Sequence, residues 1–260
     1  MLVLTTKMKF DDLPTDIINK LQFYTEENCS LLEIDQDIIP YVHKMVPYEE
    51  TFSENHEHFL KLIIDKPIEI PITFKSLIEI DCSYSNLTKL PVLTQLPNLT
   101  NLNCSDNNIS IIPKELVNLK TLLCHDNNIS IIPKELSCLV TLDCSNNNIS
   151  IIPKELVNLK TLLCYNNSII TIPNNFANII ILDFSYNNIK KIPDTFTKLR
   201  KLWCAGNSQI SEVPDTLISL ERLICSGTDI KTVPNTLINL ENLRSIAPAF
   251  LKSQKNWVIQ

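Results

Sequence analysis

Hydrophobic residues recur along most of this chain at intervals of 20 to 22 residues, in the same order each time. An apolar residue opens each interval, at Ile80, Leu102, Leu122, Leu142, Leu162, Leu182, Leu202, Leu223 and Leu243. Two residues later stands a cysteine or a phenylalanine, at Cys82, Cys104, Cys124, Cys144, Cys164, Phe184, Cys204 and Cys225. An asparagine follows three residues further on, at Asn107, Asn127, Asn147, Asn167, Asn187 and Asn207. Proline closes each interval, at Pro91, Pro113, Pro133, Pro153, Pro173, Pro193, Pro214 and Pro234.

Each interval predicts one coil of a stacked structure. The leucine and the cysteine are two residues apart, which is typical of a short strand with both side chains on one face. The asparagine amide can bond to backbone groups that the following turn leaves unpaired. One coil cannot bury its apolar face alone, so we expect the strands of successive coils to pair in parallel. Because each interval is short, we expect extended or 3₁₀ return segments between the strands.

Part of the pattern is repeated with an identical sequence. The ten residues "NNISIIPKEL" begin at Asn107, Asn127 and Asn147, and the longer run "NNISIIPKELVNLKTLLC" ends at Cys124 and again at Cys164. No catalytic site needs identical consecutive copies. The repeated residues therefore specify the shape of the scaffold, and function must lie in the residues that change between coils.

This pattern resembles the short-repeat variety of the leucine-rich repeat family over roughly residues 76–246. The resemblance implies a leucine-rich repeat solenoid bent into an arc or horseshoe, with a parallel β-sheet on its concave face. It also implies a non-enzymatic scaffold or adaptor that binds a partner protein on that face. We expect the repeats to span residues 60–245, because a weaker unit begins at Leu60, twenty residues before Ile80.

Three positions depart from the family pattern. Ser85 and Thr228 stand where asparagine is expected, so the turns should be held less firmly near the two ends of the array. One additional residue between Cys204 and Pro214 predicts a bulged loop near Ser208.

Residues 1–59 lack the repeat and are acidic, because their aspartates and glutamates outnumber their lysines. The stretch "FDDLPTDIINKL" places apolar residues at helical spacing after a proline. One interpretation is a small helical N-terminal cap over the open end of the solenoid, which such arrays require. The other is an F-box, whose opening the stretch resembles. In that case residues 10–22 would dock components of a cullin-type ubiquitin ligase. Residues 246–260 should form a C-terminal cap.

Composition argues against several other classes of protein. Only two glycines are present, so phosphate-binding glycine loops are not expected. No basic block of the kind that binds nucleic acid occurs, and no apolar run approaches the ~20 residues that span a bilayer. The opening "MLVLTTKMKF" has too short an apolar run for a secretory signal. We therefore expect a soluble, intracellular (cytoplasmic) monomer that binds neither nucleic acid nor membrane.

The cysteines and histidines suggest no metal, cofactor or catalytic site. The nine cysteines form no C-x-x-C pair, and those in the repeat column should pack inside as small hydrophobes, reduced and without a metal. Cys29 and Cys138 lie off the column without a partner that suggests a nucleophile. His56 and His58 form an H-x-H pair without an evident third ligand, and His125 falls on an exposed strand position.

The outward strand positions vary between coils. Most are small and polar, but larger residues gather in the C-terminal half, at Leu163, Tyr165, Tyr186, Trp203 and Ile224. Aromatic residues beside aliphatic ones are typical of protein interfaces. The predicted partner-binding residues are Leu163, Tyr165, Asp183, Tyr186 and Trp203, where Asp183 would orient a donor group. The alternatives are incidental exposure, or a Trp203 covered by the C-terminal segment. A second functional hypothesis is a substrate receptor, with the N-terminus on the ligase and the repeats on the substrate.

Overall fold

The computed structural model describes residues 21–26, 29–34, 60–63, 77–93 and 96–244. Near the N-terminus, strands β1 (Leu21–Glu26) and β2 (Cys29–Ile34) pair antiparallel. These residues are strands, whereas the sequence analysis expected a largely helical cap. The predicted helix before Leu21 and the predicted C-terminal cap at residues 246–260 lie outside the described residues.

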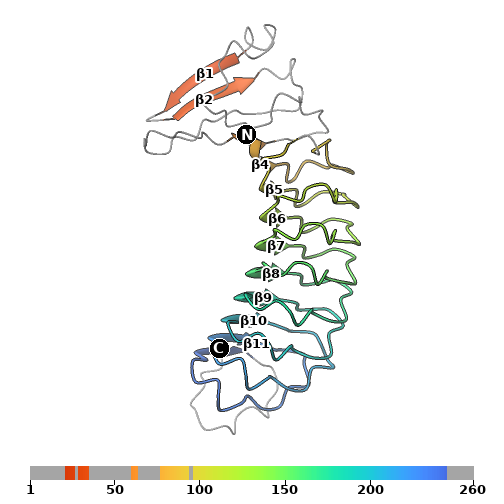
Figure 1. Cartoon of the computed structure of the whole chain (residues 1–260), viewed down its shortest axis with the longest axis vertical. Coiled ribbons are helices and arrows are strands. Elements are labelled where there is room, and N and C mark those ends of the chain that lie inside the picture. The colour runs from red at the N-terminus through yellow and green to blue at the C-terminus, as the bar shows by residue number, and fades with distance from the viewer. Residues whose placement is uncertain (1–20, 27–28, 35–59, 64–76, 94–95, 245–260) are drawn as a thin grey trace.

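A single parallel sheet of ten strands runs through the rest of the described chain. Its strands are β3 (Leu60–Ile63), β4 (Leu77–Asp81), β5 (Asn101–Asn103), β6 (Thr121–Leu123), β7 (Thr141–Asp143), β8 (Thr161–Leu163), β9 (Ile181–Asp183), β10 (Lys201–Trp203), β11 (Arg222–Ile224) and β12 (Asn242–Arg244). Each strand pairs with its neighbours in sequence, so every coil adds one strand to the stack. Figure 1 shows β4 to β11 along one side of the solenoid and the return segments along the other. The predicted solenoid is confirmed.

The register between strands follows the predicted inward column. Leu102 lies opposite Ile80 and Leu122, and the same pairing of inward residues continues to Leu243. Strand β3 occupies the place of the weaker unit expected at Leu60, which the sequence analysis aligned with Ile80 at the full spacing of twenty residues. There, however, Leu62 lies opposite Ile80, because this first step is two residues shorter than the common period.

The return segments are extended and contain paired turns. In a typical coil, Leu116 N donates to Pro113 O and Leu119 N donates to Leu116 O, with the i to i+3 spacing of a 3₁₀ turn. These turns do not continue into a helix anywhere in residues 77–93 or 96–244. The additional residue near Ser208 is accommodated by a turn in which Ile210 N donates to Asn207 O at 3.1 Å. The predicted bulged loop is therefore present.

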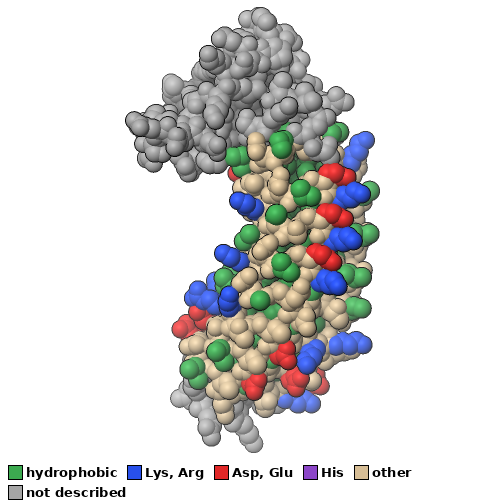
Figure 2. Space-filling model, in the orientation of Figure 1, with side chains coloured by type: hydrophobic (Ala, Val, Ile, Leu, Met, Phe, Trp, Pro, Cys, Tyr) green, Lys and Arg blue, Asp and Glu red, His purple; other side chains and the backbone are tan. Residues whose placement is uncertain are grey.

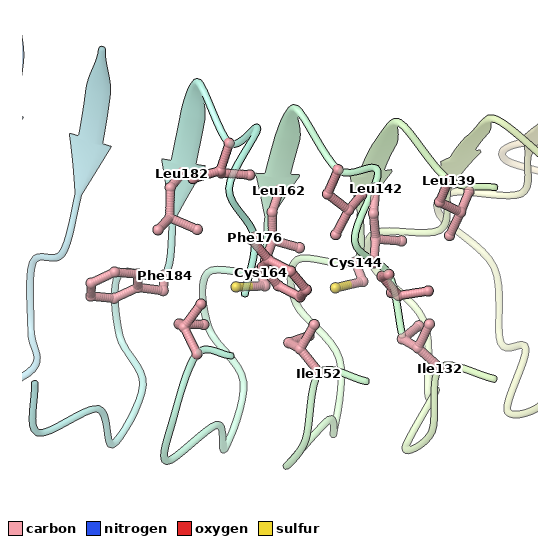
Figure 3. Packing of buried hydrophobic residues seen from close by; sticks show 14 of the residues in the cluster. Ile132, Leu139, Leu142, Cys144, Ile152, Leu162, Cys164, Phe176, Leu182 and Phe184 are labelled. Carbon is pink, nitrogen blue, oxygen red and sulfur yellow. The ribbon is translucent and has the colours of Figure 1, made fainter. Parts of the chain in front are cut away.

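The core is a set of continuous columns between the sheet and the return segments. Leucine, cysteine and isoleucine columns run through successive coils, and Figure 3 shows Cys144 and Cys164 in one column next to Phe184. The column cysteines Cys82, Cys104, Cys124, Cys144, Cys164, Cys204 and Cys225 are all buried, and none is in a disulfide. Phe176, Phe184 and Phe196 are the largest fully buried side chains, and they thicken the C-terminal half of the core.

An asparagine ladder joins each coil to the one before it. Asn127 Nδ2 lies 3.2 Å from Cys124 O in its own coil and 2.9 Å from Cys104 O in the preceding coil. Its Oδ1 accepts a hydrogen bond of 2.8 Å from Ile109 N, also in the preceding coil. Each such side chain is buried or nearly so, and it pairs backbone groups that the turn would otherwise leave unpaired. At the ends, hydroxyls make local bonds instead, from Ser85 Oγ to Ser83 O and from Thr228 Oγ1 to Cys225 O.

Removal of one ladder side chain should destabilise the array. Asn147 bonds to Cys124 O, Cys144 O and Ser145 O and accepts from Ile129 N. Asn147→Ala leaves these buried groups unpaired, so we expect a loss of about 3 kcal/mol in the free energy of unfolding. Chemical denaturation measures it. Asn148→Ala, at the adjacent exposed position, is the control and should change stability by less than about 0.5 kcal/mol. Equal losses would contradict the ladder.

The buried thiols should make the fold sensitive to alkaline pH. Burial, together with the charge of Asp81, raises the pKa of Cys82 from 9.0 to about 12. In the unfolded chain this thiol ionises from about pH 9, so its contribution to stability is complete below pH 9 and is lost as the pH rises towards 12. We expect Cys82→Val to give a shallower loss of stability over this range. Unfolding titrations of both proteins from pH 8 to 11 test this, and parallel profiles would contradict it.

Candidate functional site

The outward face of the sheet brings three of the five predicted residues into one row. Leu163 ends β8, Asp183 ends β9 and Trp203 ends β10, and the strand register places the three side by side. All three side chains are partly buried. Ile224 on β11 continues the same row beside Trp203. The row of outward residues predicted from the sequence spacing is therefore present on the sheet.

A left-handed turn follows every strand in this row. The residue two after the column cysteine or phenylalanine has a positive φ in each coil: Tyr84 (55°), Asp106 (54°), Asp126 (53°), Asn146 (51°), Asn166 (52°), Tyr186 (53°), Gly206 (73°) and Gly227 (72°). Asparagine, aspartate and glycine tolerate this conformation, whereas a bulky side chain is strained in it. The two tyrosines are therefore the unexpected members of the row.

Tyr186 is the most exposed of the five predicted residues, with 64% of its surface accessible. Its ring lies over the next turn, at Gly206. A Cβ atom added at Gly206 would stand 2.7 Å from Tyr186 Cδ1, closer than side chains approach one another. Gly206 thus serves both the left-handed turn and the close approach of the tyrosine ring.

Tyr165 is partly buried and hydrogen-bonded within the face. Asn146 Nδ2 donates to its hydroxyl at 2.7 Å, and Asn166 Nδ2 donates to Asn146 Oδ1 at 2.7 Å. The ring and these two amides form one neutral, paired cluster across two coils. A partner would therefore meet a fixed Tyr165 rather than a freely rotating one.

Asp183 stabilises the turn after β9, a role that its predicted outward position on the strand does not indicate. Its Oδ1 accepts a hydrogen bond of 2.8 Å from Ser185 N, as Asp143 Oδ1 accepts one from Ser145 N at 3.1 Å. Burial raises the pKa of Asp183, and the bonds from Ser185 oppose that shift. The carboxylate orders the turn after β9, and that bond uses one of its oxygens.

Two kinds of strand end alternate along the middle of this face. Strands β7 and β9 end in Asp143 and Asp183, each with a serine two residues later, whereas β6, β8 and β10 end in Leu123, Leu163 and Trp203. Apolar side chains therefore recur at every second strand, about 10 Å apart.

The opposite side of the solenoid is charged. Figure 2 shows acidic and basic side chains alternating down one edge, with hydrophobic side chains beside them. The repeated "PKEL" supplies exposed lysines such as Lys134 and Lys154. Each of the three identical repeats also exposes one isoleucine, at Ile111, Ile131 and Ile151.

The sequence analysis missed one exposed aromatic on the strand side. Tyr84 has 78% of its surface accessible and the same left-handed backbone as Tyr186. It lies at the N-terminal end of the face, far along the array from the five predicted residues. The sequence could have indicated it, because Tyr84 stands two residues after the column cysteine, where most other coils carry asparagine, aspartate or glycine.

The comparisons with known proteins agree with this architecture. The Leucine Rich Repeat family model matches residues 98–119, 118–139, 138–159 and 178–199. The part of the chain that forms the solenoid thus contains four matches to the leucine-rich repeat model and shares the fold of solved leucine-rich repeat proteins. No curated protein sequence matches it. The described residues contain no helix that could cross a membrane.

Solved structures of leucine-rich repeat proteins resemble the chain. The functional domain of InlJ from Listeria monocytogenes, which includes a cysteine ladder, is 27% identical, with a TM-score of 0.63 over 70% of this chain and 44% of that one. Internalin InlF from the same organism is 20% identical, with a TM-score of 0.61 over 68% of this chain and 58% of that one, and shows the fold alone.

A third similar structure is a receptor domain. The ectodomain of the plant membrane receptor kinase GASSHO1/SCHENGEN3 from Arabidopsis thaliana was solved in complex with CASPARIAN STRIP INTEGRITY FACTOR 2. It is 26% identical, with a TM-score of 0.55 over 67% of this chain and 28% of that one. The chain therefore spans 58% or less of the length of each of these three relatives.

The contact between Tyr186 and Gly206 can be tested by a double-mutant cycle. Gly206→Ala should lower the free energy of unfolding by about 1–2 kcal/mol, through the positive φ and the clash with the ring. In a Tyr186→Asn background only the strain at φ remains, so the loss should be smaller. Chemical denaturation of the four proteins measures both. An identical loss in the two backgrounds would show that the ring does not lie over Gly206.

Proposed function

We propose that this chain is a non-enzymatic scaffold that binds a partner protein on the concave strand side, through Leu163, Tyr165, Asp183, Tyr186 and Trp203. The leucine-rich repeat fold is typical of protein–protein interaction modules. The described coils share nearly identical scaffold residues, so a partner can be distinguished only by the outward positions that differ.

The exposed, left-handed Tyr186 carries the proposal. Apart from Tyr84, its sister turns hold asparagine, aspartate or glycine, which adopt this backbone at lower cost. A tyrosine there costs about 1 kcal/mol of backbone strain and leaves most of its ring in water. Since strain of this kind concentrates at ligand-binding positions, Tyr186 is best explained by a contact made in a complex.

The spacing of the neighbouring side chains fits one partner element. Leu163 and Trp203 are separated by two strand intervals, about 10 Å, with Asp183 between them. A partner segment with two apolar side chains at that distance and a donor between them would match the row. Burial of a tryptophan and a tyrosine at the centre of such a contact is typical of binding hot spots.

The similar structures support the same class of function. GASSHO1/SCHENGEN3 was solved with a bound protein factor, so a related solenoid presents a surface that binds another polypeptide. The structure describes only Leu21 and Gln22 of the F-box-like stretch, so the alternative of a ubiquitin-ligase substrate receptor rests on the sequence resemblance alone.

We further propose a reducing, intracellular location for the scaffold. The column cysteines and Cys138 are free thiols, and Cys138 is exposed on the return side. Exposed thiols persist most readily where the compartment keeps cysteines reduced.

The test converts the patch into the residues of its sister coils. Tyr186→Asn copies the turn residue at 146 and 166, and Trp203→Leu copies the strand residue at 123 and 163. Both substitutions introduce residues that occupy the corresponding positions in other coils, so the double variant should fold. A photo-crosslinking amino acid at Trp203 first identifies the partner, and binding is then measured with the two purified proteins. We expect the double variant to weaken binding at least tenfold.

The matched control is Lys134→Ala with Lys154→Ala on the charged return side, which should leave affinity unchanged. If the lysine variant loses binding and the tyrosine–tryptophan variant keeps it, the partner occupies the outer surface and the proposed face is wrong.

A further inference from the structure

A histidine and two aspartates converge on the strand side of β5 and β6, away from the proposed protein-binding residues. His125 Nδ1 lies 2.8 Å from Asp126 Oδ2 and 3.7 Å from Asp106 Oδ2. One ligand atom from each of the three residues lies within 4.8 Å of the other two. The sequence analysis did not group them, because Asp106 belongs to a different coil from His125.

The chain contains its own neutral copy of this cluster, two coils further along. Asn146, Tyr165 and Asn166 occupy the positions that correspond to Asp106, His125 and Asp126. The same run, "NNISIIPKELVNLKTLLC", immediately precedes both His125 and Tyr165, so the two clusters rest on matched scaffolds. In the neutral copy the tyrosine hydroxyl and both amides are joined by hydrogen bonds of 2.7 Å.

In the charged cluster the corresponding bonds are not made. Asp106 Oδ2 is buried and has no hydrogen-bond partner among the described residues. A buried acceptor without a donor is destabilising, and the two neighbouring carboxylates repel each other.

A proton on His125 does not resolve this arrangement. The Nδ1 position carries at most one hydrogen, and the 2.8 Å contact directs it to Asp126. Asp106 Oδ2, at 3.7 Å, lies beyond hydrogen-bond distance from the same nitrogen. A single small cation between the three atoms would instead contact all of them.

We propose that Asp106, His125 and Asp126 form a binding site for a divalent transition-metal ion of the zinc class. Imidazole nitrogen with carboxylate oxygens is a ligand set that Zn²⁺ accepts, with bonds of about 2.0–2.2 Å. Tetrahedral bonds of that length separate neighbouring ligand atoms by about 3.4 Å. The separations from His125 Nδ1 to the two carboxylate oxygens, 2.8 Å and 3.7 Å, lie on either side of that value. Because one ligand atom from each residue lies within 4.8 Å of the other two, side-chain rotations can bring all three to a shared ion. The partly exposed side chains leave a coordination position for water.

The neutral copy supplies variants that exchange the two clusters. Asp106→Asn, His125→Tyr and Asp126→Asn together turn the charged cluster into the neutral one. Asn146→Asp, Tyr165→His and Asn166→Asp make the reverse change at the second position. Each variant uses residues that the same turn already holds elsewhere in the chain, which favours folding of both.

Zinc chloride is titrated into the full-length proteins by calorimetry, and Co²⁺ absorption reports nitrogen and oxygen ligation. We expect the neutralised variant to bind one ion fewer than the natural chain, and the reverse variant to bind one more. Ions held elsewhere, for example at His56 and His58, are common to all three proteins and cancel in the comparison. The same zinc stoichiometry in the natural chain and the neutralised variant would overturn the proposal and leave His125 as an ion-pair partner of Asp126 alone.

Discussion

The asparagine ladder is the interaction on which the rest of this structure depends. Each side chain lies within hydrogen-bond distance of carbonyl groups in two coils and accepts an amide from the earlier one. Without it, the tight left-handed turn after each strand would leave buried backbone groups unpaired. Strands β5 to β12 can therefore each end after three residues. The outward positions are the surface that this ladder holds in place.

A fixed scaffold makes small differences between coils chemically significant. Two coils with the same preceding run of sequence carry His125–Asp126 in one case and Tyr165–Asn166 in the other. One pair belongs to a charged cluster with a buried unpaired oxygen, and the other to a neutral cluster with its bonds made. The backbone is alike in both, so the difference in chemistry comes from the side chains alone. The array therefore works as a regular frame on which separate sites can be placed a few coils apart.

The sequence was sufficient for most of the fold and for part of the candidate site. The recurring leucine, cysteine and asparagine predicted the strands, their parallel order and the buried column, because so short a coil offers few other ways to bury them. The face shared by Leu163, Asp183 and Trp203 followed from the same period. The left-handed backbone of Tyr186 could not be predicted in this way. Tyrosine disfavours that conformation, and the turn imposes it only in the folded chain. The hydrogen bond from Ser185 N to Asp183 Oδ1 depends on the geometry of the turn, which the spacing of outward strand positions does not predict.

Near-identical neighbours also have a consequence for how this chain finds its native pairing. The segments from Asn107, Asn127 and Asn147 are interchangeable over ten residues, so β6 could pair with β8 instead of β7 with almost the same apolar contacts. Such a mispaired state would leave out one coil and still bury most of the apolar side chains. It would therefore be stable enough to act as a kinetic trap during folding. Irregular coils prevent the mispairing from spreading. Phe184 in the cysteine column and the additional residue near Ser208 occur once each. Because each fits at only one place in the stack, they would fix which strands pair in the more regular coils before them.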